Sequence, residues 1–127
     1  MNSASKGKKA PFLKSFGYAF AGIKQAVKQE RNFQIHLGVT VIVIIMGALL
    51  SISYLEWLFI IFSIGGMLSM EMVNTSIEKV VDLVTEEYHP LAKAAKDIAA
   101  GAVLLFAIMS VIIGLIVFLP KILLLIT

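Results

Sequence analysis

The chain contains no cysteine among its 127 residues, which excludes a disulfide scaffold, thiol catalysis and thiolate metal sites. Charged residues are also scarce, at 15% against roughly 25% in typical globular proteins, so a hydrated surface on every side is excluded. The two histidines, His36 and His89, stand alone and lack metal-ligand spacing. In place of charge the chain has 59% hydrophobic residues and a mean hydropathy of +0.93. One domain of this length cannot bury so much apolar surface in water, which indicates an integral membrane protein.

Three stretches of the chain carry no charge, namely residues 37–55, 57–70 and 98–120. The first and third are long enough to cross a bilayer, and the apolar pattern of the second continues to Val84. We therefore expect an all-α integral membrane protein with one domain over residues 1–127. Its three transmembrane helices are expected at about 33–55, 57–84 and 92–120.

The positive charge is concentrated at the N-terminal end. Residues 1–36 carry seven Lys and Arg against one Glu, whereas residues 51–54, between the first two spans, carry no charge. Cytoplasmic segments of membrane proteins are enriched in Lys and Arg. This predicts a cytoplasmic N-terminus, a cytoplasmic link between the second and third spans, and a C-terminus outside.

The segment before the first span has the pattern of a helix with two faces. After a basic tail at residues 1–11, a helix over residues 12–30 places Phe16, Phe20 and Ile23 on one face and Lys24 and Lys28 on another. Such a helix suits the headgroup boundary of an anionic leaflet. The alternative is a helix that simply packs on the other helices.

A polar stripe interrupts the second apolar segment. Glu71, Asn74, Thr75, Glu78 and Asp82 share one helical face, and Glu71 follows fourteen uncharged residues. Ionisable groups near the membrane interior cost several kcal/mol, which favours a functional role. Repelling carboxylates and other oxygen ligands favour a hard cation such as Mg²⁺, which usually completes its shell with water and substrate phosphates. The alternative is a solvated stripe at a helix end, which fits Asp82 better than Glu71.

A candidate phosphate-binding segment follows at residues 87–97. Pro90 stands where a helix can begin, and Lys93 and Lys96 then share one face just before the third span. Lysine is a suitable point charge for a phosphoryl group. The alternative is that both lysines only anchor the helix on the cytoplasmic side.

These residues resemble the small membrane kinases of prokaryotes, the diacylglycerol kinase and undecaprenol kinase family. The resemblance covers nearly the whole chain. Residues 30–36 and 89–97 are most similar to the Gram-positive branch, whose members phosphorylate undecaprenol. The matching residues are Glu30, Glu71, Asn74, Thr75, Glu78, Asp82, Glu87, Tyr88, His89, Ala95, Lys96 and Asp97.

The resemblance implies a homotrimer in the bacterial plasma membrane, with active sites built between neighbouring subunits on the cytoplasmic side. It implies transfer of the γ-phosphoryl group of Mg-ATP to a lipid hydroxyl, with undecaprenol as the first candidate and diacylglycerol as the alternative. Glu71 matches the general base, Asn74 a residue that orients the site, and Lys96 the lysine that contacts phosphate. Glu30 and Glu78 match the Mg²⁺ carboxylates. The positions that match the nucleotide site are Tyr18, Asp82, Glu87, Tyr88, His89 and Asp97.

Two residues depart from the diacylglycerol-specific relatives. His36 stands where those relatives carry a second glutamate, and Pro11 where they carry an arginine, with only Lys14 close by. Both departures affect the lipid-entry and nucleotide side, so they bear on which lipid alcohol is used.

Two other classes of function are left open by the residues themselves. One is a cation or proton path along the polar stripe, and the other is an accessory subunit that packs through the small residues at 94–102. The stripe stops on one side of the membrane, which argues against a path. An accessory subunit has no use for Glu71 or Glu78. Binding of nucleic acid lacks a folded soluble face.

Overall fold

A computed structural model describes residues 11–127, and over these residues the chain is all helical apart from short links. The helices are α1 (Phe12–Gln29), α2 (Arg31–Leu49), α3 (Tyr54–Val84) and α4 (Pro90–Ile126). The last three are long and apolar enough to cross a membrane. The prediction of an all-helical chain with three candidate spans is therefore confirmed. The predicted basic tail lies outside the described residues except for Pro11.

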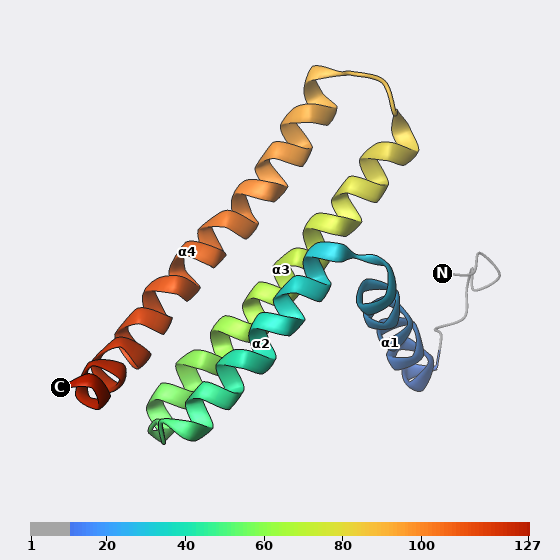
Figure 1. The fold of residues 1–127 in the computed structure, drawn as a ribbon. Coiled ribbons are helices and arrows are strands. Elements are labelled where there is room, and N and C mark those ends of the chain that lie inside the picture. Colours follow the sequence, from blue (N-terminus) through green and yellow to red (C-terminus); the bar gives the residue numbers. More distant parts are fainter. Residues whose placement is uncertain (1–10) are drawn as a thin grey trace.

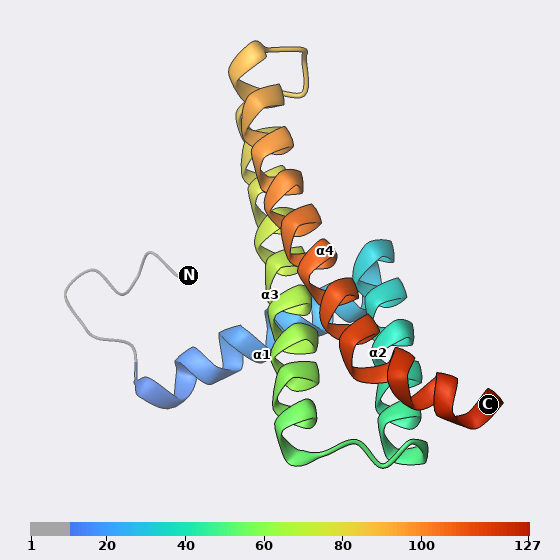
Figure 2. The same cartoon turned by 90° about the vertical axis from the view of Figure 1, so that its left-hand side faces the viewer.

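The helices differ in length, and this difference shapes the molecule. At 1.5 Å per residue, α2 is about 28 Å long, α3 about 46 Å and α4 about 55 Å, against a hydrocarbon core of about 30 Å. Figure 1 shows α3 and α4 as an antiparallel hairpin, with α2 beside only the part of α3 nearest the α2–α3 link. The α3–α4 interface is the largest in the structure. Figure 2 shows α1 projecting away from the other three helices.

The link between α2 and α3 is fixed by two capping motifs. Ser51 has a φ of 51°, and the backbone N–H groups of Ser51 and Ile52 donate to the carbonyls of Ala48 and Gly47 at 3.3 and 3.2 Å. This is the Schellman end of a helix, with serine at the left-handed position that glycine usually takes. The motif ends α2 at Leu49, six residues before the boundary expected at residue 55.

The next helix begins with a capping box. The side chain of Ser53 accepts from the Glu56 backbone N–H at 3.2 Å, and Glu56 Oε1 accepts from the Ser53 backbone N–H at 3.0 Å. As a result, α3 begins at Tyr54 rather than at residue 57.

The last helix starts and ends differently from the expected 92–120. His89 Nδ1 accepts from the Leu91 backbone N–H at 3.1 Å, and Pro90 occupies the first helical turn, where its missing N–H is not needed. The helix then passes through Pro120 and ends at Ile126. Pro120 removes one backbone N–H donor from the helix, and the neighbouring residues can still form their backbone hydrogen bonds. At the C-terminal end of α4, the backbone N–H and the hydroxyl of Thr127 donate to the Leu123 carbonyl.

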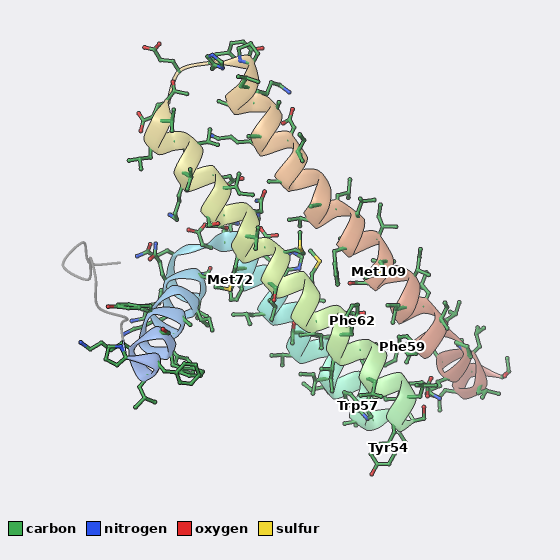
Figure 3. All side chains as sticks on the ribbon, turned by 180° about the vertical axis from the view of Figure 1, so that it is seen from behind. Tyr54, Trp57, Phe59, Phe62, Met72 and Met109 are labelled. Atoms are coloured by element: carbon green, nitrogen blue, oxygen red, sulfur yellow. The ribbon has the colours of Figure 1, made fainter. Side chains whose placement is uncertain are left out.

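The apolar core lies near the α2–α3 link and the end of α4. It consists of Ile52, Ile60, Val117 and Phe118, with Trp57 packed against it. Figure 3 shows Tyr54 and Trp57 at this end of α3. Most of the remaining large apolar side chains are exposed, as expected for surfaces that face lipid or other helices.

Further along, α3 and α4 are held by aromatic and small residues. The rings of Phe62 and Phe106 lie 5.9 Å apart. A Cβ atom at Gly66 would come within 1.9 Å of Phe106 Cζ, so the glycine makes room for that ring. This close approach of the two helices brings their polar ends together.

Candidate active site

The polar residues of α3 begin where the helix is still packed. Glu71 and Asn74 are 4% and 8% exposed, and they continue the buried face formed by Ile60, Ser63 and Met67. At 1.5 Å per residue, Glu71 lies about 26 Å from the start of α3, near the edge of a hydrocarbon core of about 30 Å. A carboxylate is thus buried at the boundary between the apolar helices and the segment that extends beyond them. We refer to residues 71–97 together with Glu30 and His36 as the polar end.

The carboxylate of Glu71 faces a histidine of α2. His36 Nε2 lies 3.7 Å from Glu71 Oε2, and their side chains are 29% and 5% exposed. Within residues 11–127, no Lys or Arg nitrogen lies within 4.0 Å of this carboxylate. The contact joins α2 to α3 at the level where the polar stripe starts.

One turn further along α3, Asn74 has an acceptor without a partner. Its Nδ2 donates to Glu78 Oε1 at 3.3 Å, whereas its Oδ1 is buried and has no hydrogen-bond partner among the described residues. A buried polar atom without a partner costs roughly 1–3 kcal/mol. The amide therefore has a free oxygen that a donor or a cation would satisfy, beside a carboxylate that it already orients.

The carboxylate of Glu30 approaches α3 from the junction of α1 and α2. Lys79 Nζ lies 3.4 Å from Glu30 Oε1. The two residues line a cavity of about 180 Å³ between α1 and α3, together with Met72 and Thr75. Figure 3 shows Met72 on the side of α3 that faces α1.

The α3–α4 loop holds a second, more polar cavity of about 240 Å³. Lys96, which lines this cavity, donates from Nζ to Asp82 Oδ1 at 2.6 Å across the hairpin, and Lys93 donates to Asp97 on α4. Both lysines expected to contact phosphate are therefore paired with an acid in this structure. The cavity brings together five of the predicted nucleotide-site residues, which are Glu87, Tyr88, His89, Lys96 and Asp97.

Other predicted residues are not brought together. Tyr18 lies on α1, is 51% exposed, and lines neither of these two cavities. Within residues 11–127, no group of three or more His, Asp or Glu side chains is placed to hold a metal ion. Glu30 pairs with Lys79, which is turned by about 100° from Glu78 on the helix.

The donor chemistry of these residues nevertheless fits Mg²⁺. Glu30, Glu78 and the free Oδ1 of Asn74 offer only oxygen atoms, which are the ligands that a hard cation prefers. Mg²⁺ is commonly bound through one or two carboxylates, with water and substrate phosphates filling the remaining positions. A single chain therefore does not need to supply three carboxylates.

Sequence reasoning missed the contact of His36 with Glu71, which joins two helices. A signal for it was present, since His36 stands 13 residues before the end of α2 and Glu71 stands 17 residues after the start of α3. In an antiparallel pair these counts correspond to about 20 and 26 Å, which is the same depth to within about one turn. His36 also lines a mostly apolar cavity of about 280 Å³ between α2, α3 and α4. Ser110 Oγ, in the same cavity, is buried and has no partner among the described residues.

The chain has relatives among known proteins. It matches a family described as prokaryotic diacylglycerol kinase over residues 17–118. It is 54% identical over 110 residues to the undecaprenol kinase of Bacillus subtilis, covering 87% of this chain and 89% of that protein. It is 45% identical over 112 residues to a diacylglycerol kinase of Synechocystis (87% and 64% of the two chains). With the diacylglycerol kinase of Escherichia coli K12 it shares 30% identity over 100 residues (79% and 82%). The chain therefore belongs to the prokaryotic diacylglycerol kinase family.

Proposed function

We propose that this protein is an ATP-dependent lipid kinase that transfers the γ-phosphoryl group of Mg-ATP to the hydroxyl of a membrane lipid alcohol, namely undecaprenol. The observation that carries the proposal is the position of Glu71. A buried carboxylate stands at the edge of the apolar helices, between an apolar cavity on one side and a polar loop cavity further along the same hairpin. A lipid hydroxyl and a water-borne nucleotide would meet at that level.

The residues of the chain divide the work of phosphoryl transfer. Glu71 takes the proton of the alcohol, whose oxygen attacks the γ-phosphorus while the bond to the β-phosphate oxygen breaks and ADP leaves. Asn74 orients Glu78 through the hydrogen bond from its Nδ2. Its Oδ1, which has no partner among the described residues, can accept from a donor or bind a cation. Lys96 and the loop cavity bind the nucleotide, with Lys96 exchanging Asp82 for phosphate oxygens. Glu30 and Glu78 would hold Mg²⁺, and the ion would supply positive charge against the phosphates.

The choice of undecaprenol rests on similarity. The relative named undecaprenol kinase shares 54% identity with this chain, whereas the two reported relatives named diacylglycerol kinase share 45% and 30%. The polar chemistry of the site acts on any primary alcohol at the membrane boundary, so diacylglycerol is the alternative acceptor.

The orientation and the first helix complete this proposal. The polar end faces the cytoplasm, where ATP is available, and α1 lies along the same membrane surface. The exposed Phe16 and Phe20 and the basic Lys24 and Lys28 of α1 support this placement. The single-cysteine variant Glu86→Cys should resist an impermeant thiol reagent in intact cells, and labelling there would contradict the orientation.

We also propose that three copies assemble and share sites. The support is that one chain leaves Tyr18 apart from the loop cavity and leaves large apolar surfaces on α2 and α4 exposed. Co-expression of Glu71→Gln with Lys96→Met, each inactive alone, should restore part of the activity if a site combines residues of two subunits. No restoration in demonstrated mixed oligomers would contradict shared sites.

The function is tested by presenting undecaprenol and diacylglycerol side by side in mixed micelles with radiolabelled ATP and Mg²⁺. We expect label in undecaprenyl phosphate, with a higher kcat/KM than for diacylglycerol. A preference for diacylglycerol would correct the acceptor. If folded protein labels neither lipid, the kinase assignment is contradicted.

A further inference from the structure

The contact of His36 with Glu71 is not explained by packing alone. The His36 side chain is 29% exposed, and its Nε2 lies 3.7 Å from the most buried carboxylate of the described residues. That distance exceeds a hydrogen bond but is within the range at which a histidine nitrogen and a carboxylate oxygen attract each other. Catalytic contacts are often long before substrate binds.

A carboxylate that is 5% exposed needs a partner. Burying one without a compensating charge or donor is costly, and within residues 11–127 no hydrogen bond reaches the Glu71 side chain. Apart from Glu86 and Glu87 in the α3–α4 loop, the other charged groups of the polar end are engaged elsewhere. Their pairs are Glu30 with Lys79, Asp82 with Lys96, and Lys93 with Asp97, while Glu78 accepts from Asn74.

His36 also stands between two environments. Of the α2 residues that line the apolar cavity, it is the one nearest the polar end, so one side of its ring borders that cavity while Nε2 faces Glu71. His36 therefore contacts the carboxylate and lines the end of the cavity at the same time.

We infer that His36 is a positioning residue that holds Oε2 of Glu71 and so aims the other carboxylate oxygen at the hydroxyl of the lipid alcohol. The inference rests on the proposed function, in which Glu71 accepts the alcohol proton. Holding the Glu71 carboxylate in place should raise the rate of the reaction, because a misplacement of a catalytic group by about 1 Å lowers the rate by up to about 100-fold.

The test compares two substitutions at one position. His36→Leu keeps the bulk and removes the N–H, whereas His36→Gln keeps an N–H donor at a similar reach. We expect His36→Leu to lower kcat roughly 10- to 100-fold with the KM for Mg-ATP unchanged, and His36→Gln to stay within about threefold of the parent. Thr40→Val is the matched control, because Thr40 lies one turn along α2 and its hydroxyl donates to the His36 backbone carbonyl rather than to a side chain. If His36→Leu does not fold, His36→Asn replaces it, since the shorter amide does not reach Glu71.

A second measurement separates positioning from a general structural effect. If His36 acts only through Glu71, adding His36→Leu to Glu71→Gln should lower kcat by less than about twofold beyond Glu71→Gln alone. Full additivity, or a kcat for His36→Leu near that of the parent, would overturn the inference and leave the kinase assignment standing. Absence of lipid phosphorylation by the parent would instead overturn the proposed function.

Discussion

The two ends of the α3–α4 hairpin use their charged residues in opposite ways. At the end formed by residues 50–57 and 117–121, which we call the capped end, one carboxylate binds two partners. Glu56 Oε1 accepts from the Ser53 backbone N–H at 3.0 Å and lies 3.1 Å from Lys121 Nζ of α4. This network is closed, and it lies beside the apolar core.

The polar end is open by comparison. It buries a carboxylate whose nearest ionisable partner is a histidine at 3.7 Å, and it leaves Asn74 Oδ1 without a partner among the described residues. Networks in which each atom is satisfied stabilise a fold, whereas unmet polar atoms cost stability and are kept where a ligand will meet them. The comparison supports the proposed division, in which the capped end holds the helices together and the polar end is the site of the chemistry.

Removing the charge of a carboxylate should have the largest effect on kcat at the polar end and little effect on kcat at the capped end. Glu30→Gln and Glu78→Gln should each lower kcat at least about 100-fold and raise the Mg²⁺ concentration needed, because a metal ion contributes several kcal/mol to the transition state. The measurement is kcat as a function of Mg²⁺ concentration. Glu56→Gln, on α3 but at the capped end, is the control and should keep its kcat while unfolding more readily.

Near-parental activity of Glu30→Gln or Glu78→Gln at limiting Mg²⁺ would remove that residue from the proposed metal site. A large loss of kcat in folded Glu56→Gln would contradict the proposed difference in role between the capped end and the polar end.

A substitution in the packing beside the capped end should affect stability alone. A Cβ atom at Gly47 would lie 2.7 Å from Cη2 of Trp57, so Gly47→Ala should destabilise the fold by about 1–3 kcal/mol through overpacking. Because Trp57 is the single tryptophan, its fluorescence follows unfolding in detergent mixtures. Gly38→Ala is the control, since a Cβ there meets no heavy atom of the described residues within 4 Å beyond its own stretch of helix backbone, and it should be neutral or slightly stabilising. An unchanged midpoint for Gly47→Ala would show that Trp57 moves freely.

The smallest effect on stability is expected for substitutions in the link between α2 and α3. Ser51 adopts a φ of 51°, a conformation that glycine accepts without strain, so Ser51→Gly should stabilise the protein by up to about 1 kcal/mol. Ser53→Ala, two residues away, should have the opposite sign and cost about 1 kcal/mol, since it removes the helix cap. Paired unfolding curves check both values, and a loss of stability in Ser51→Gly would contradict the motif assigned to this link.

The sequence was sufficient for the three spans, because charge-free runs report directly on helices that can cross a membrane. Their ends were predicted less well. The end of α2 depends on the left-handed conformation of Ser51, which is not expected for serine. The helix α4 continues through Pro120, although proline often ends a helix.

The polar stripe was predicted as one face, but its division into buried and exposed parts was not. Burial of Glu71 and Asn74, and exposure of Glu78, follow from where α2 begins alongside α3, which is a property of the packed helices. For the same reason the contact with His36 and the pairing of Lys96 with Asp82 could not be read from spacing within one helix.

The most direct test of the division between the ends is the rate of Glu71→Gln measured beside its nucleotide binding. The substitution keeps the shape of the side chain and removes the proton acceptor at the polar end. We predict that Glu71→Gln binds Mg-ATP about as well as the parent, and that its kcat falls roughly 10²-fold or more and loses the pH dependence of the parent rate. A loss of nucleotide affinity in proportion to the loss of rate, or a retained pH profile, would contradict this account and make Glu71 a ligand or a structural group.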